Sequence, residues 1–188
     1  FDMDGTLIDS GFAITNTINY VRENLGFEKL EKNHILEKVN DPSINSAEFF
    51  YGTKEFTPQQ TKLFEEYYNI HCLTDLAVYD GISKLIDDLS KDFTLAVATN
   101  ANSDYAHKML NHVGLGHHFK TILGYDSVSK PKPHPEMVNK ILDIHKISNV
   151  NAQLIGDSHK DIMAATKAGV DSVLVNWGFS NLEKYAIE

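Results

Sequence analysis

Cysteine, arginine and long hydrophobic runs are scarce in this sequence of 188 residues. Cys72 is the single cysteine, so no disulfide can form within the chain, and we expect a reducing, cytoplasmic setting. No apolar run approaches the length of a membrane-spanning helix and no signal peptide is visible, so we expect no membrane partner. The chain opens without methionine and within a predicted strand, which leads us to expect a few strand residues before Phe1.

Basic residues are outnumbered, with 17 Lys and Arg against 26 Asp and Glu, and the net charge is -9 without any basic run. Nucleic acid is not an expected partner, because neutralising its phosphates takes clustered Lys and Arg. An apolar content of 42% and a charged content of 23% are those of an ordinary globular protein. A chain of this length can bury one sizeable core and a small second one.

Residues 11–75 show helical periodicity and no β pattern. Apolar residues recur every three or four positions over 14–25, which predicts an amphipathic helix. Residues 30–52 predict short helices that are broken at Asp41-Pro42 and at Gly52.

A further helix is predicted where Thr57 precedes Pro58 and Gln60 follows three positions after the threonine, a pattern typical of a capped helix start. We therefore expect residues 11–75 to form a small all-α cap domain, inserted after the first strand.

Residues 76–188 alternate short apolar strands with amphipathic helices. The predicted strands lie at 93–99, 121–123, 152–155 and 172–175. This alternation is typical of an α/β fold with a parallel sheet and helices on both faces. Together with residues 1–10, which supply the first strand, we expect a Rossmann-like core, with functional groups gathered at the carboxyl ends of its strands.

Two aspartates open the sequence, in the stretch Phe1-Asp2-Met3-Asp4-Gly5-Thr6-Leu7-Ile8-Asp9-Ser10. On an extended strand, side chains at positions i and i+2 point the same way and lie roughly 6.5 Å apart, so Asp2 and Asp4 would project together. Two carboxylates so close repel each other and need a cation, a shared proton or both. The alternative is a polar strand end in which Asp4-Gly5 is only a turn signal.

Polar residues also follow two later strands. Thr99-Asn100 closes the strand at 93–99, where Thr and Asn most often cap a helix or form a turn. Gly156-Asp157-Ser158-His159-Lys160-Asp161 follows the strand at 152–155 and opens a helix, with Asp157 and Asp161 on one face of its first turn. These acids could also serve as helix caps, worth about 1 kcal/mol. We expect His159 and Lys160 to be exposed.

Three of the five prolines alternate in Ser129-Lys130-Pro131-Lys132-Pro133-His134-Pro135-Glu136-Met137. Proline restricts its own backbone and that of the preceding residue, so we expect an extended loop that aims a lysine in a fixed direction. The alternative is a rigid loop with solvated lysines, and we expect His134 to be a loop residue.

Taken in chain order, the four stretches resemble the motifs of the haloacid dehalogenase-like hydrolases. Phe1–Ser10 resembles the first motif, Asp-x-Asp-Gly-Thr-Leu-x-Asp-Ser, almost letter for letter, and the three others resemble the second, third and fourth motifs. The third, Lys-Pro-x-Pro before a helix, fits in two registers. We prefer Lys132, which leaves the usual single residue before the helix, although Lys130 also matches. The resemblance covers Phe1–Ser10 and Asp80–Trp177, and residues 11–75 agree only in length and helical content.

The resemblance implies a phosphatase that acts on a small phosphorylated molecule. Asp2 would be the nucleophile that forms an aspartyl-phosphate, and Asp4 would be the acid and base. The Thr99 hydroxyl and the neighbouring Asn100 N–H would hold the phosphoryl oxygens, and Lys132 would neutralise their charge.

The resemblance also implies a Mg²⁺ cofactor. Asp2, Asp157 and Asp161 would hold it together with a main-chain carbonyl near Asp4, Asp161 either directly or through water. Oxygen ligands in octahedral array are those that Mg²⁺ prefers.

Among members of the family, the nearest resemblance is to phosphoglycolate-phosphatase-like proteins, and the acid at position 4 argues for phosphatase chemistry. Phosphosugar mutases of the family use a cap arginine, and Arg22 is the only arginine here. A mutase, and a catalytically idle phosphate-binding regulatory protein, stay as alternatives. Phosphoglycolate, pyrophosphate, a nucleotide and a sugar phosphate stay open as substrates, and the sequence predicts no oligomeric state.

Overall fold

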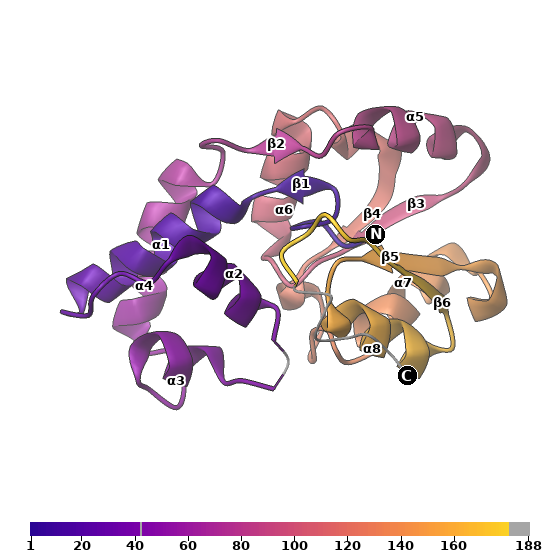
Figure 1. Ribbon diagram of the computed structural model, residues 1–188. Helices are drawn as coiled ribbons and strands as arrows, with labels where there is room; N and C mark the ends of the chain where they lie inside the picture. The colour runs from indigo at the N-terminus through magenta and orange to yellow at the C-terminus, as the bar shows by residue number, and fades with distance from the viewer. Residues whose placement is uncertain (42, 181–188) are drawn as a thin grey trace.

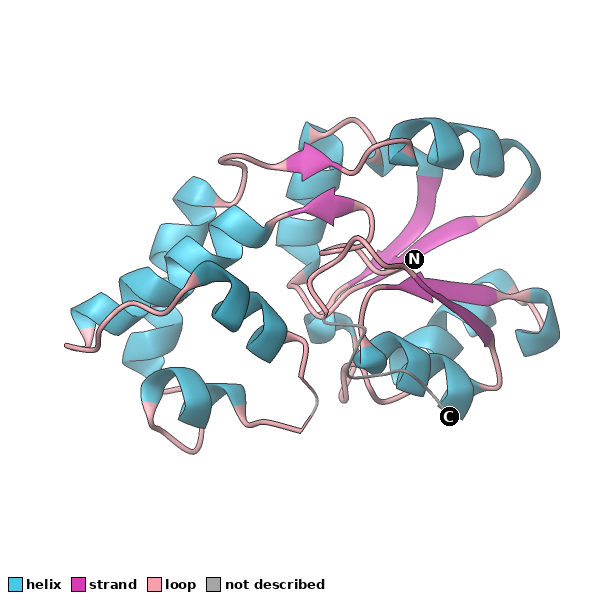
Figure 2. Cartoon of the chain, in the orientation of Figure 1, coloured by secondary structure: helices cyan, strands magenta, loops and turns pink. Residues whose placement is uncertain are grey.

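The computed structural model describes residues 1–41 and 43–180, so the predicted helix break at Pro42 lies outside the described residues. Two parallel strand pairs carry the α/β part. β3 (Leu95–Ala98) pairs with β4 (Phe119–Leu123), and β5 (Gln153–Gly156) pairs with β6 (Asp171–Leu174). These strands confirm the predicted alternation and the α/β fold class (Figure 2).

The first residues of the chain join the two strand pairs. The Phe1 amino group donates to the Ala96 carbonyl at 2.9 Å and the Phe1 carbonyl accepts from the Ala98 N–H at 2.9 Å, while the Asp2 N–H donates to the Ile155 carbonyl at 2.8 Å. The order across the sheet is therefore β4, β3, Phe1–Asp2, β5 and β6.

The predicted first strand is shorter than expected. Asp4 makes only an isolated bridge to Ile8, and the chain turns between them, with the Leu7 N–H donating to the Met3 carbonyl at 2.9 Å. Gly5, at a φ of 79°, supplies the backbone freedom for this turn. Asp2 and Asp4 thus do not sit on one regular strand.

Helices cover both faces of this sheet, as predicted (Figure 1). α5 (Ile82–Asp92) and α6 (Ser103–His112) pack on one face, where Val97 shares a buried cluster with Ile86 and Met109. α7 (Glu136–His145) and α8 (His159–Ala168) pack on the other. There Ala98, the next residue of the same strand, packs against Met137, as the alternation of side chains along a strand requires.

Four helices fill the segment between the first turn and residue 72: α1 (Gly11–Asn24), α2 (Lys32–Val39), α3 (Ser46–Tyr51) and α4 (Pro58–His71). Thr57 and Gln60 form the predicted capping box at the start of α4. The helices enclose a buried cluster of their own around Val21, Ile35 and Phe50. The division into a core of 1–10 and 76–188 and a cap of 11–75 stays a prediction.

The two ends of this helical segment lie side by side. β1 (Ile8–Asp9) precedes it, β2 (Ala77–Val78) follows it, and the two pair antiparallel, with Ile8 opposite Val78. Strands of two residues carry no periodicity, so this pair was not predicted. It places entry to and exit from the helical segment at one point beside the turn after Asp4.

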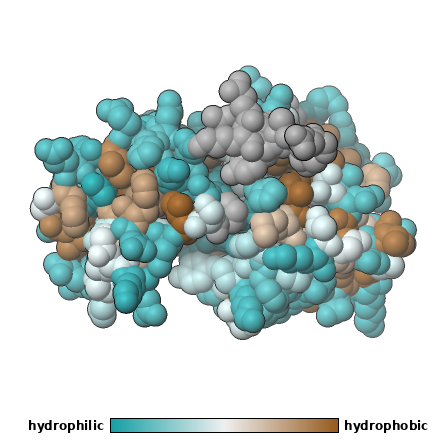
Figure 3. All heavy atoms as spheres, turned by 60° about the horizontal axis from the view of Figure 1, so that its bottom comes forward, coloured by the Kyte–Doolittle hydropathy of each residue, from teal (hydrophilic) through white to brown (hydrophobic). Residues whose placement is uncertain are grey.

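In the part of the chain that the structure describes, three short 3-10 helices complete the connections: η1 (Gly116–His118), η2 (Tyr125–Ser127) and η3 (Asn149–Asn151). Figure 3 shows a face on which hydrophilic residues predominate and hydrophobic residues form small separate groups. Within residues 1–41 and 43–180, no helix has the length and apolar character needed to span a membrane.

Candidate active site

Three buried carboxylates meet at the carboxyl ends of the sheet segments. Oxygen atoms of Asp2, Asp157 and Asp161 lie within 4.8 Å of one another, and none of the three side chains is more than slightly exposed. Asp2 ends the segment between β3 and β5, Asp157 follows β5, and Asp161 lies in the first turn of α8. Sequence reasoning placed these acids at strand ends, and the structure brings the three together.

Lys132 supplies the positive charge of the cluster. Its Nζ lies 2.8 Å from Asp2 Oδ1 and 2.5 Å from Asp161 Oδ1, and its side chain is buried. Lys130 is exposed. The structure therefore places Lys132 among the carboxylates and Lys130 at the surface.

The loop that carries Lys132 is not extended, so that expectation was wrong. The His134 N–H donates to the Pro131 carbonyl at 2.9 Å, which closes a turn, and the Lys132–Pro133 peptide bond is cis. Glu136 fastens the start of the loop by accepting from the N–H and hydroxyl of Ser129. The direction of Lys132 is thus set by a turn.

Asn100 fixes the backbone of Lys132. Its Nδ2 donates to the Lys132 carbonyl at 2.8 Å, and its Oδ1 accepts from the Lys132 N–H at 3.0 Å. The Asn100 side chain is engaged in these two bonds. The predicted phosphate contact of Asn100 would therefore be made by its backbone N–H.

Asp4 lies apart from the carboxylate cluster. One of its oxygens accepts from the Ser10 hydroxyl, and the other from the Thr99 hydroxyl at 3.4 Å. Burial raises the pKa of Asp4, and the hydrogen bond from Ser10 opposes that rise. A raised pKa favours the protonated form of the acid, which is the form that a proton donor requires.

The cluster carries more negative charge than Lys132 neutralises. Burial raises the pKa of Asp2 to about 8 and the Asp161 carboxylate adds to the rise, while Lys132 opposes it. Burial also raises the pKa of Asp157 to about 7. Burial alone would lower the pKa of Lys132, but Asp161 and Asp2 outweigh it and raise that pKa. The three carboxylates therefore need protons or a further cation.

Asp161 has two roles at once. Its Oδ2 accepts from the Ser158 N–H at 3.1 Å and the Ser158 hydroxyl at 2.6 Å, which caps α8, while its Oδ1 faces Lys132. Asp161 therefore caps α8, as the alternative interpretation of the sequence had it, and it also belongs to the carboxylate cluster.

Asp157 leaves one oxygen open. Its Oδ2 accepts from the Phe179 N–H at 2.7 Å and from Asn40 Nδ2 at 3.2 Å, whereas its Oδ1 is buried without a hydrogen-bond partner. A buried carboxylate oxygen without a partner is costly unless something else binds it. Three carboxylates and one open oxygen fit a hard divalent cation such as Mg²⁺.

Gly5 permits the close approach of the first turn to Asp157. A Cβ atom on residue 5 would lie 2.3 Å from Asp157 Oδ2, far inside contact distance. Glycine is therefore required here by space as well as by its φ of 79°.

Four contributors to the site were missed by sequence reasoning: the Ser10 hydroxyl, the Phe179 N–H, Asn40 and Lys160. Ser10 stood inside the quoted first motif, so that signal was present. The expectation that His159 and Lys160 are exposed was wrong, because both are half-buried and Lys160 Nζ donates to the Val39 carbonyl at 2.8 Å. The other contacts join distant parts of the chain and have no local signal.

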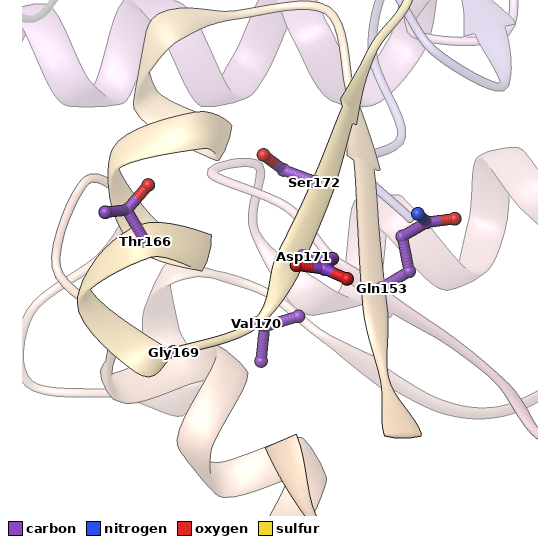
Figure 4. A pocket seen from close by; sticks show the side chains of 6 residues that line it. All are labelled: Gln153, Thr166, Gly169, Val170, Asp171 and Ser172. Atoms are coloured by element: carbon purple, nitrogen blue, oxygen red, sulfur yellow. The ribbon is translucent and has the colours of Figure 1, made fainter. Parts of the chain in front are cut away.

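A hollow of about 620 Å³ lies elsewhere (Figure 4). Its lining comes from α8, β5, β6 and the turn before β6: Gln153, Thr166, Gly169, Val170, Asp171 and Ser172. Gln153 and Asp171 begin their strands, so the hollow lies at the amino ends of β5 and β6, opposite the end at which parallel sheets collect their chemistry. We assign it no part in the site.

Comparison with known proteins agrees with this geometry. The sequence profile described as haloacid dehalogenase-like hydrolase matches residues 1–175. The chain belongs to the haloacid dehalogenase-like hydrolases. It is 30% identical to a phosphoglycolate phosphatase of Aquifex aeolicus over 97% of the chain and 85% of that protein. It is 26% identical to a 5'-nucleotidase of Pseudomonas aeruginosa over 96% of the chain and 83% of that protein.

A crystal structure of a predicted phosphatase from Clostridium acetobutylicum superposes with a TM-score of 0.86 at 26% identity, and covers 99% of this chain and 88% of that one. The predicted resemblance is therefore confirmed, and this haloacid dehalogenase-like hydrolase is an enzyme of the phosphatase class.

Proposed function

We propose that this hydrolase is a Mg²⁺-dependent phosphatase that cleaves a small-molecule phosphate monoester through an aspartyl-phosphate on Asp2. The observation that carries the proposal is the placement of Asp2. It is held by Lys132 and lies within 4.8 Å of Asp157 and Asp161, with Asp4 apart and hydrogen-bonded to Ser10.

The charges explain why these groups are needed together. Two unit charges 3.5 Å apart at an effective dielectric of about 20 repel by about 5 kcal/mol, so a carboxylate approaching a phosphate dianion meets about 9 kcal/mol. Lys132 supplies one positive charge, and it already faces two carboxylates. A divalent cation held by the carboxylates would supply the remainder.

Asp2, Asp157 and Asp161 would hold the cation, and the open Asp157 Oδ1 is the atom that most needs it. When bound, Mg²⁺ would withdraw charge from the phosphoryl oxygens.

The steps on the protein follow from the two environments of Asp2 and Asp4. An Asp2 oxygen attacks phosphorus, the bond to the leaving oxygen breaks, and the Asp4 proton passes to that oxygen. Asp4, now ionised, takes a proton from water as the water attacks the aspartyl-phosphate, which releases phosphate and restores the Asp2 carboxylate. The Thr99 hydroxyl, the Asn100 N–H and Lys132 would bind the phosphoryl oxygens throughout.

The substrate class is proposed from the relatives and from the helical segment. Relatives named as phosphoglycolate phosphatases and as a 5'-nucleotidase support a small phosphate monoester. Residues 11–75 would close over it as a cap and exclude water. Arg22 does not favour the mutase alternative, because its guanidinium donates to the Phe50 and Glu28 carbonyls within the helical segment.

The test is hydrolysis of a panel of phosphoglycolate, 5'-nucleotides, sugar phosphates, pyrophosphate and p-nitrophenyl phosphate, with Mg²⁺ and with excess chelator. We expect release of phosphate that requires Mg²⁺ and is lost in Asp2→Asn. Full activity in chelator would contradict the metal requirement. Binding without turnover on every compound would favour the idle phosphate-binding protein.

A further inference from the structure

The carboxyl end of α2 reaches the site across the boundary between the helical segment and the α/β part. Asn40, the residue after α2, donates from Nδ2 to Asp157 Oδ2 at 3.2 Å, although 117 positions separate the two in sequence. Figure 1 shows α2 between α1 and the α/β part of the molecule. Asn40 is half-buried at this contact.

A second bond holds the same helix end in place. Lys160 Nζ, from the first turn of α8, donates to the carbonyl of Val39, the last residue of α2, at 2.8 Å. A cation suits this position, because the last carbonyls of a helix lack intrahelical donors and carry partial negative charge. The two bonds therefore run in parallel, one residue apart on α2, to two residues that flank the N-terminus of α8.

The Asn40 bond is one of two that hold the Asp157 carboxylate in its orientation. Phe179 N–H and Asn40 Nδ2 both bind Oδ2, and this arrangement leaves Oδ1 as the open oxygen among the clustered acids. A cavity of about 240 Å³ beside this contact is lined by residues of α2 and by the segment of Phe179: Asn33, Leu36, Glu37, Gly178, Phe179 and Ser180. Phe179 follows β6 of the α/β part, whereas Asn40 follows α2 of the helical segment.

We propose that Asn40 is a positioning residue for Asp157, so that docking of the helical segment strengthens metal binding and metal binding strengthens docking. The proposal rests on the metal role of Asp157 in the proposed function. It adds that a residue of the helical segment acts on the metal centre through a carboxylate oxygen. Groups that orient a metal ligand in this way commonly change metal affinity by 10–100-fold, and such coupling is reciprocal.

The test measures Mg²⁺ binding without substrate, by isothermal titration calorimetry on the full chain. We expect Asn40→Ala to weaken Mg²⁺ binding by about 10–100-fold. Asn24→Ala is the matched control, since Asn24 is an exposed asparagine of the same segment whose amide donates to the Tyr20 carbonyl within the same helix. It should bind Mg²⁺ as the wild type does. Melting of each variant in chelator checks that it folds.

Hydrogen exchange supplies a readout that a merely structural role would not move. In the wild type, Mg²⁺ should slow exchange of the backbone amides at the carboxyl end of α2, and in Asn40→Ala this effect should be lost. If Asn40→Ala binds Mg²⁺ with unchanged affinity, the proposal is wrong, and a raised KM alone would make Asn40 a substrate contact instead. If the wild type itself binds no Mg²⁺, both the proposed function and this inference fail.

Discussion

At the scale of single residues, Lys132 sets the charge balance of the site. It is buried between Asp2 and Asp161, whereas Lys130, two positions earlier, is exposed. Replacing Lys132 leaves buried carboxylates without their partner, which costs more than losing a solvated charge.

Lys132→Ala should lower kcat/KM for p-nitrophenyl phosphate by about 10²–10³-fold, as the loss of charge stabilisation in a transition state does. Lys130→Ala is the matched control and should cost less than about 1 kcal/mol, the value of an exposed charge. Circular dichroism of both variants checks the fold. If Lys130→Ala loses more kcat/KM than Lys132→Ala, the phosphate-binding lysine is Lys130 and our assignment is wrong.

At the scale of elements, some features are fixed by residues that are neighbours in sequence, and others by contacts between residues far apart in sequence. The start of α4 is fixed by neighbouring residues. The Thr57 hydroxyl oxygen accepts from the Gln60 N–H at 3.3 Å, and Gln60 Oε1 accepts from the Thr57 N–H at 2.9 Å.

Thr57→Ala should lower the free energy of unfolding by about 1 kcal/mol, the usual worth of such a cap, and leave kcat nearly unchanged. Denaturant unfolding measures the first quantity, and steady-state kinetics measures the second. Thr74→Ala, at an exposed threonine just beyond α4, serves as control and should change neither. A large loss of kcat in Thr57→Ala would show that α4 acts on the site directly.

The features that could be predicted from the sequence are those with a local signal, and the features that could not are made by contacts between distant residues. Strands β3 to β6, the helices between them and the capping box have periodicity or local motifs, and so do Asp2, Lys132, Asp157 and Asp161. The β1–β2 pair could not be predicted, because strands of two residues have no period. The Asn40–Asp157 contact could not be either, because nothing near Asn40 in sequence indicates which residue it meets. The three alternating prolines led to the wrong prediction of an extended loop, because a turn satisfies their backbone restrictions equally well.

At the scale of the whole molecule, the buried acids make stability depend on pH and metal together. In the native protein without metal, Asp2 has a pKa of about 8 and Asp157 of about 7, against 3.8 for an ordinary aspartate. The native state therefore holds protons that the unfolded chain has released. Since stability falls with pH wherever the native state binds more protons, these groups destabilise the metal-free protein as pH rises from about 5 to 8.

Mg²⁺ should reverse this trend, because it binds the ionised carboxylates. We expect the melting temperature in chelator to be lower at about pH 8 than at about pH 6, and the increase on adding Mg²⁺ to be larger at the higher pH. Asp157→Asn, which removes one ligand, should lose most of the Mg²⁺ effect. A metal-free melting temperature that rises with pH over this range would contradict the account.

The central claim for the molecule is that Asp2 carries the phosphoryl group and Asp4 moves the protons. The measurement is a mass spectrum of intact protein after rapid acid quench with p-nitrophenyl phosphate and Mg²⁺. This substrate has a good leaving group, so Asp4→Asn should still form the aspartyl-phosphate but hydrolyse it about 10²–10⁴-fold more slowly, and an added phosphoryl mass should accumulate. Asp2→Asn should show no added mass. A phosphoryl label that survives in Asp2→Asn would mean that Asp2 is not the nucleophile and would contradict the mechanism.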